Sequence, residues 1–295
     1  MLAGAETELI NSFGLYLKKI GKKDATIQSY RRDISQFFEF LTYNRVPITD
    51  IDNKTLGHYR IEMIKKNKRG KINSFRRAVI AIRQFFKFLP QFSTILVNPL
   101  EKVPIPNRQE PRPRILSKSD IENLFSACKT DTKLKQCRDK AIVALFSFEG
   151  IKISELIQLE WKHFLYSPNK SSLLIPGERS RNIFLYEKTA TLILDYKNIF
   201  DQHNDFLPKK TKMFLGFKGK DQSLLAPKVS RHGLKFMLYE LGNSCNLSSL
   251  NTENLRHFAI QFLINQGLSP EAIMKHLGLR QIGNIAKHSK SLKKL

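Results

Sequence analysis

A short proline-rich segment constrains the fold of this chain more than any other feature. Residues 104–113 read PIPNRQEPRP, with four prolines, polar neighbours and no hydrophobic periodicity. Proline fixes φ and lacks a backbone N–H donor, so neither a helix nor a central strand can continue through such a run. The segment therefore predicts an extended linker between an N-terminal domain, residues 1–103, and a C-terminal domain, residues 114–295.

The N-terminal part shows helical periodicity in two stretches, residues 24–41 and 71–89. Asp24 is the expected cap of the first stretch. Apolar residues recur at helical spacing in both and predict a buried face. These residues are Ile27, Tyr30, Ile34, Phe37, Phe38, Leu41, Ile72, Phe75, Val79, Ile82 and Phe86. Core packing explains the phenylalanines better than stacking on bases, which disfavours an RNA-binding protein.

The C-terminal part also reads as mainly helical, with one β signal. Ser117 and Asp120 form a capping-box pattern, and Ser269, Pro270 and Gly278 bracket another helix. Residues 172–185 predict two short strands joined by a basic, glycine-containing turn. Further helices are expected over 137–150, 151–161, 189–200, 230–242 and 254–267. The chain thus predicts a mainly α protein with a small β-hairpin or sheet.

The net charge indicates a polyanionic partner. Lys and Arg number 50 and Asp and Glu 26, a net charge of +24, and both halves are basic. Nucleic acid is the usual partner of such a protein, although ribosomal binding or adhesion to anionic lipid gives the same balance. Arg31 and Arg32 lie on the polar face of one helix, and Arg76, Arg83 and Lys87 form a stripe on another. The alternative is that such a stripe is simply a solvated face.

Composition also argues against several other classes. No uncharged apolar run approaches the roughly 20 residues that span a bilayer. The first residues lack the pattern of a secretory signal. Three cysteines without metal-ligand spacing suit a reducing cytoplasm. His257, His276 and His288 lie on different segments without ligand spacing, so we expect no metal and no cofactor.

Four segments in order resemble tyrosine recombinases of the Xer or phage-integrase type. TIQSYRRDISQFFEFL is similar to the first helix of the family's N-terminal core-binding, SAM-like domain. NPLEKVPIPNRQEPRPRILSKSDIENLF is similar to its interdomain linker and the entry to its catalytic domain. The third and fourth segments are CRDKAIVALFSFEGIKISELIQLEW and NLRHFAIQFLINQGLSPEAIMKHLG, which resemble its two arginine-bearing segments. The resemblance implies a core-binding domain followed by a catalytic-fold domain.

The resemblance also implies a chemistry. A tyrosine hydroxyl attacks the scissile phosphodiester, and this leaves a 3′-phosphotyrosyl link and a free 5′-hydroxyl. No metal takes part, so two arginines neutralise the charge that develops on the phosphoryl oxygens. A lysine on a β-hairpin turn serves as general acid, and histidines assist proton transfer.

This sequence departs from the family pattern at the first arginine and at the hairpin. Lys152 stands in place of the first arginine, while Glu155, three residues later, is kept. The hairpin lysine position falls near Pro176, and Arg179 and Arg181 are only loose substitutes because arginine is a poor proton donor.

The last segment departs from the pattern as well. Arg256 matches the second arginine, and a histidine follows it as usual. Glu253 stands where the family has a histidine, Leu279 replaces the histidine after "LG", and the nucleophile position falls at His288. An ion pair with Glu253 is the alternative role for Arg256.

The missing nucleophile does not depend on the register of any alignment. Tyr239 is the last tyrosine of the chain, whereas the family nucleophile follows the second arginine. Ser289, Ser291 or His288 could in principle attack phosphorus, but Lys152 and Glu253 would hold the transition state poorly. We therefore expect a fold that binds DNA without cleaving it.

The sequence thus predicts a cytoplasmic binder of double-stranded DNA from this family, with two domains that clamp the duplex and no membrane contact. An active or partner-dependent recombinase, alone or in an oligomer with a related recombinase on DNA, is the first alternative. A regulatory or maintenance DNA-binding protein is the second. The expected phosphate contacts are Arg31, Arg32, Arg76, Arg83, Lys87, Lys152, Arg179, Arg181 and Arg256.

Overall fold

The computed structural model forms two compact units, Met1–Pro111 and Arg112–Leu295. It describes residues 2–66, 72–91, 104–107, 115–130, 132–203, 212–218, 224–281 and 285. Within the predicted linker the described residues 104–107 are neither helix nor strand. The linker bounds of 104 and 113 stay a prediction, because most of this segment lies outside the described residues.

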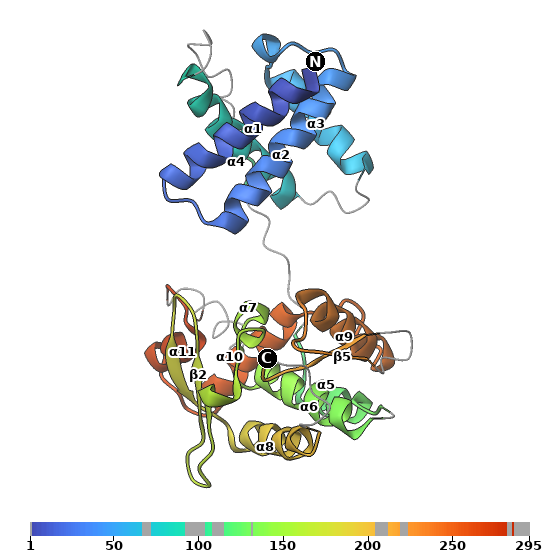
Figure 1. Ribbon diagram of the computed structural model, residues 1–295, viewed down its shortest axis with the longest axis vertical. Helices are drawn as coiled ribbons and strands as arrows, with labels where there is room; N and C mark the ends of the chain where they lie inside the picture. The colour runs from blue at the N-terminus through green and yellow to red at the C-terminus, as the bar shows by residue number, and fades with distance from the viewer. Residues whose placement is uncertain are drawn as a thin grey trace. The chain divides into compact units, whose positions relative to one another are not determined.

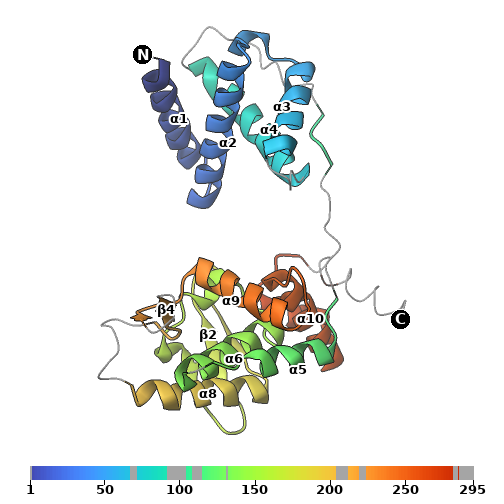
Figure 2. The same ribbon diagram turned by 90° about the vertical axis from the view of Figure 1, so that its right-hand side faces the viewer.

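Every regular element among the described residues of the first unit is a helix (Figure 1). The elements are α1 (Leu2–Lys19), α2 (Asp24–Tyr43), η1 (Ile48–Asp50), α3 (Asn53–Lys66), α4 (Ile72–Phe88) and η2 (Leu89–Gln91). Helices α2 and α4 pack together, and α1 lies beside α2 (Figure 2). Both predicted helices are confirmed, but the expected cap is wrong, because Lys23 occupies the N-cap and Asp24 is already helical.

Aromatic side chains fill the core of this unit. Phe37, Phe38, Phe85 and Phe86 are all buried, which confirms that they are core residues. Phe85 meets Phe38 edge-on at 5.4 Å between ring centroids and Phe13 at 5.2 Å. Such edge-to-face pairs stabilise a core beyond the area that they bury.

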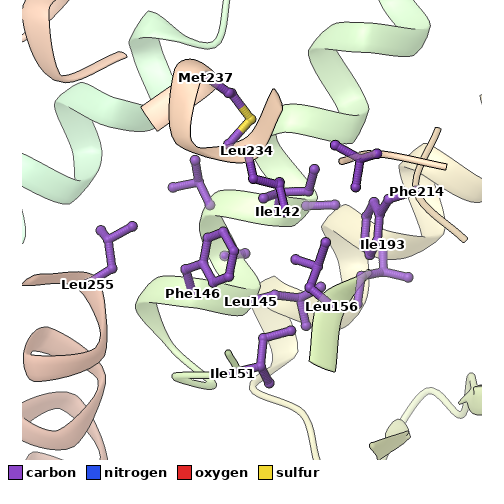
Figure 3. Packing of buried hydrophobic residues seen from close by; sticks show 14 of the residues in the cluster. Ile142, Leu145, Phe146, Ile151, Leu156, Ile193, Phe214, Leu234, Met237 and Leu255 are labelled. Carbon is purple, nitrogen blue, oxygen red and sulfur yellow. The ribbon is translucent and has the colours of Figure 1, made fainter. Parts of the chain in front are cut away.

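In the second unit, the other elements pack around one central helix, α6 (Lys133–Ser147). Its other helices are α5 (Lys118–Ala127), α7 (Ile153–Leu156), η3 (Trp161–His163), α8 (Glu187–Asp201), α9 (Arg231–Ser244), α10 (Thr252–Asn265) and α11 (Pro270–Leu277). Every residue of α6 from Ala141 to Phe146 is almost fully buried. Figure 3 shows Ile142, Leu145 and Phe146 of α6 within the hydrophobic cluster that α7, α8 and α9 complete. A helix apolar on all sides is typical of the middle of a large domain.

The predicted caps of this unit are confirmed. Ser117 accepts from the N–H of Asp120, and the Asp120 carboxylate accepts from the N–H of Ser117. Ser269 caps α11, Pro270 begins it, and Gly278 ends it in the left-handed conformation. These residues fix where α11 stops, which matters for the site below.

The predicted hairpin is present within a larger sheet. Strands β1 (Phe164–Leu165), β2 (Ser172–Ile175) and β3 (Arg181–Phe184) form an antiparallel sheet in the order β1-β2-β3, with Ile175 opposite Arg181. A second pair, β4 (Gly216–Lys218) and β5 (Leu224–Ala226), is antiparallel too. Sequence reading missed β1, β4 and β5 because two or three residues are too few to show a period of two.

The helices of the described residues also bear on membrane association. None of them is both long enough and apolar enough to cross a bilayer. The three cysteines are free, and Cys128 is buried. Burial raises the pKa of the Cys128 thiol, as expected for a small core residue.

Candidate nucleic-acid interface

Lys152 lies at the start of α7, directly after a tight turn. Gly150 in this turn has φ +58°, and a Cβ there would come within 2.6 Å of Leu277 Cδ2 and 3.0 Å of Ala259 Cβ. Only glycine suits such a position. The turn therefore presses the chain just before Lys152 against α10 and α11.

Arg256 on α10 lies where this turn contacts the end of α11. Asn251 caps α10 through the N–H groups of Glu253 and Asn254, so the helix starts one turn before Arg256. The guanidinium is buried and donates to the carbonyl oxygens of Gly150 and Leu277, the latter at 2.8 Å. Arg256 thus joins the turn before Lys152 to the end of α11.

The β2–β3 hairpin supplies two more arginines. Arg181 Nη1 and Nη2 lie 3.0 and 3.3 Å from the two carboxylate oxygens of Glu155, and its Nε donates to the carbonyl of His276 at 2.6 Å. Arg179 donates to the carbonyl of Gly278. In Figure 1 the hairpin containing β2 lies beside α11, and contacts between β3 and α11 agree with this.

Three consecutive carbonyls at the end of α11 are therefore each capped by a different arginine. Arg181 binds the carbonyl of His276, Arg256 that of Leu277 and Arg179 that of Gly278. The last carbonyls of a helix lack intrahelical partners and carry partial negative charge, so cations stabilise them. The helix end consequently holds three segments of the chain together.

Lys152, Arg179, Arg181, Arg256 and Glu155 form a charged cluster, and its members shift the pKa values of Lys152 and Arg256. Burial lowers the pKa of Lys152, and the neighbouring Arg256, Arg179 and Arg181 lower it further, against the opposing effect of Glu155. Burial lowers the pKa of Arg256 too, while Glu155 and Glu253 oppose the shift. The four cations thus outnumber the two carboxylates that act on them, a balance that suits a further anion such as a phosphate.

Glu155 stays ionised within the cluster. Burial by itself would raise the pKa of its carboxyl group, but the hydrogen bonds from Arg181 and from the N–H of Lys152 outweigh burial and lower it. Its Oε2 accepts from the Lys152 N–H at 2.9 Å. The carboxylate is therefore tied both to the hairpin and to the start of α7.

The remaining positions of the family pattern are arranged differently. Glu253 is exposed in the first turn of α10, and no ion pair with Arg256 is found in the described part of the chain. Leu279 is half-buried against the apolar cluster of α10 and α11. Burial lowers the pKa of His257, and Glu253 opposes the shift. His288 lies outside the described residues.

Sequence reading missed a buried pair behind this site. Glu149 is almost fully buried and accepts from the N–H of Tyr186 at 3.0 Å. His276 Nε2 lies 3.2 Å from Glu149 Oε2, a distance that suits an ion pair, although the atoms are not aligned for a hydrogen bond. No spacing along the chain signals a contact between residues so far apart. Among the described residues, no group of His, Cys, Asp and Glu could hold a metal ion.

The predicted basic residues of the first unit differ in exposure. Arg32 and Lys87 are exposed, whereas Arg31, Arg76 and Arg83 are half-buried. Arg31 donates to Asn11 Oδ1. The Nε of Arg76 is buried and finds no hydrogen-bond partner among the described residues.

Sequence reading also missed Arg77, which neighbours this stripe. Its Nε and Nη2 bind the two carboxylate oxygens of the buried Asp33, both at 2.7 Å. Helical periodicity places Arg77 on the polar side of α4 but does not reveal a partner on α2.

Comparison with known families identifies the two units. The Phage integrase family profile matches residues 114–292, and the profile "Phage integrase, N-terminal SAM-like domain" matches residues 10–91. The chain belongs to the phage integrase, or tyrosine recombinase, family.

Individual relatives agree with this assignment. Tyrosine recombinase XerC of Staphylococcus aureus strain JH9 is 22% identical over 269 residues, which cover 90% of this chain and 85% of the relative. XerC of Staphylococcus saprophyticus is 23% identical over 278 residues, or 92% and 88% of the two chains.

Solved structures confirm the fold. The XerH site-specific recombinase bound to its difH substrate has a TM-score of 0.69 at 15% identity and covers 89% of this chain and 76% of its own. The Tn1549 transposon integrase in complex with a circular intermediate DNA has a TM-score of 0.66 at 16% identity, with 95% and 94% coverage.

Proposed function

We propose that this protein binds double-stranded DNA with the tyrosine recombinase fold and does not cleave it. One observation carries the proposal: no tyrosine follows Tyr239 in the chain, and thus none follows Arg256. Without the phenol, no 3′-phosphotyrosyl intermediate can form, and strand exchange by the family route stops at its first step.

The rest of the site supports the same conclusion. Lys152 carries charge but lacks the planar fork that holds two phosphoryl oxygens at once. The hairpin turn, residues 176–180, contains no lysine to protonate a leaving oxygen. Leu279 has no group that can donate or accept a proton. These losses remove different contributions to the same phosphoryl-transfer step, charge stabilisation and proton transfer, so restoring one residue would not restore activity.

The charge distribution supports duplex binding. In the cluster around Lys152, four cations outnumber the two carboxylates that act on them, and the first unit contributes Arg31, Arg32, Arg76, Arg83 and Lys87. In this proposal the two units contact opposite sides of a duplex, with residues 104–113 as tether. A second copy, or a related recombinase, would occupy the adjacent half-site. Contacts of this kind fix position without reading bases.

A salt titration tests the binding step. Each phosphate contact contributes about −0.9 to the slope of log K against log salt concentration. The five basic residues named in the first unit would by themselves give a slope of about −4.5. A mobility-shift titration of duplex DNA from about 50 to 300 mM salt measures this slope. An affinity independent of salt would contradict the proposal. Tighter binding to an RNA duplex of the same sequence would do so as well.

A further inference from the structure

We propose that Arg181 is a positioning residue: by holding Glu155 and the end of α11 together, it orients Lys152 towards a DNA phosphate without contacting that phosphate itself. The inference rests on the proposed function, because it assumes that Lys152 meets a phosphate. It assigns Arg181 a different role from direct phosphate contact.

Arg181 already makes four hydrogen bonds inside the protein, out of the five that its N–H groups can donate. Nη1 and Nη2 bind Glu155, Nε binds the carbonyl of His276, and Nη1 also lies 3.3 Å from the carbonyl of Arg179. The side chain is only 7% exposed. A phosphate could be held by two donors of this guanidinium only by displacing one of these acceptors, and the loss of Glu155 or of the helix-end carbonyl would leave a buried group unpaired.

Glu155 links Arg181 to the backbone of Lys152. Its Oε2 accepts from the Lys152 N–H at 2.9 Å and also from Arg181. The backbone from which the Lys152 side chain projects is therefore fixed through Glu155 to the hairpin. Lys152 Nζ itself makes no hydrogen bond with the described residues, so its ammonium group is available to an external anion.

The end of α11 is shaped to receive this guanidinium. Gly278 adopts φ +59°, and a Cβ there would lie 2.9 Å from Arg181 Nη1 and 3.1 Å from its Cζ. The glycine thus leaves the space that the planar group occupies. A lysine at position 181 could bind the helix-end carbonyl or Glu155, but it has no fork with which to bind both.

The test is a double-mutant cycle on DNA binding. We expect R181K to weaken duplex binding about tenfold at fixed salt, because it keeps the charge but loses the geometry. Its salt slope should equal that of the wild type. K152A should reduce the slope by about 0.9, since one phosphate contact is lost. In the K152A background, R181K should have no further effect, because no ammonium group remains to be oriented.

Two controls separate positioning from folding and from charge. R231K makes the same exchange at an exposed arginine on α9 and should bind like the wild type. Thermal melting gives the folded fraction of each variant, to which the affinities are referred. If R181K does not fold, E155Q tests the same link, and we expect it also to weaken binding without changing the slope.

Three results would overturn the inference. In the K152A background, R181A could lower the salt slope by about a further 0.9, which would make Arg181 a phosphate ligand. Folded R181K and E155Q could both bind like the wild type, which would limit the contact to a structural role. The effects of R181K and K152A could simply add, which would separate the two residues. If wild-type binding itself is insensitive to salt, the proposed function fails instead.

Discussion

Each unit contains an arginine that donates two hydrogen bonds to a buried carboxylate, but the surroundings of the two ion pairs differ. Arg77 in the first unit is 46% exposed and binds Asp33, which is 1% exposed. Arg181 in the second unit is 7% exposed, binds Glu155 and also caps the end of α11. The first pair balances its own charge between two packed helices, whereas the second belongs to a cluster with excess positive charge.

The difference teaches that an arginine in a basic protein is not by itself a phosphate contact. Arg77, Arg181 and Arg256 each donate to acceptors inside the protein. The ammonium groups of Lys152 and of the exposed Lys87 make no such hydrogen bond with the described residues. The first group should therefore contribute mainly to folding stability and the second mainly to the salt dependence of DNA binding.

The largest expected effect is that of Arg256→Ala. The change leaves the carbonyls of Gly150 and Leu277 without their buried donor, so we expect a loss of about 4 kcal/mol in the free energy of unfolding. Urea denaturation followed by circular dichroism measures it. Arg280→Ala removes an exposed arginine near the end of α11 and should change stability by less than about 0.5 kcal/mol. Equal stability of the two variants would contradict the structural role of Arg256.

The next largest effect should be that of Gly150→Ala, with a loss of about 3 kcal/mol in the free energy of unfolding. The new methyl group would meet Leu277 Cδ2 at 2.6 Å in a left-handed backbone conformation that alanine disfavours. Gly57→Ala is a suitable control, because a Cβ there meets nothing within 4 Å. Thermal melting compares the two variants. A melting temperature unchanged by Gly150→Ala would show that the turn before Lys152 does not press against α10 and α11.

Arg77→Ala should lower the free energy of unfolding by about 2 kcal/mol, because Asp33 stays buried without its partner. The loss is smaller than for Arg256→Ala because solvent partly screens the half-exposed arginine. The salt slope of DNA binding should not change. Lys87→Ala should show the converse result, with little loss of stability and a slope reduced by about 0.9. A reduced slope for Arg77→Ala would remove the distinction between the two kinds of basic residue.

Much of the fold follows from the sequence, because its signals are local. The aromatic periodicity of residues 24–41 and 71–89 predicts α2 and α4, and Ser117, Ser269 and Gly278 mark helix ends that the structure confirms. The family assignment follows from four segments in order. Strands β4 and β5 do not follow, because three residues give no period.

The site is only partly predictable. Its residue types follow from the family pattern, and Lys152, Arg179, Arg181 and Arg256 do lie together. What the guanidinium groups bind does not follow from sequence. The carbonyls of His276 to Gly278 become acceptors for arginine only because α11 ends beside both the hairpin and α10. This arrangement depends on tertiary packing that no local pattern encodes.

The smallest expected effect concerns pH. The pKa of Lys152 lies below its ordinary value of 10.5, and a bound phosphate favours the charged form. DNA binding should therefore take up a proton as the pH approaches that lowered pKa, and affinity should fall as the pH rises through it, by at most about tenfold per pH unit. Lys152→Arg should remove this dependence, which mobility shifts at several alkaline pH values would detect. A wild-type profile identical to that of Lys152→Arg would contradict the assignment of Lys152 as a phosphate contact.

The most direct test of a DNA-binding fold without strand cleavage is a covalent trap. Duplexes selected by this protein from a random pool are nicked in turn at each position around the bound site, so that any cleavage releases a short fragment and cannot be reversed. We expect no protein–DNA species that survives boiling in detergent. A stable adduct, with its attachment residue identified by mass spectrometry, would show that the chain retains a nucleophile and would contradict the proposal.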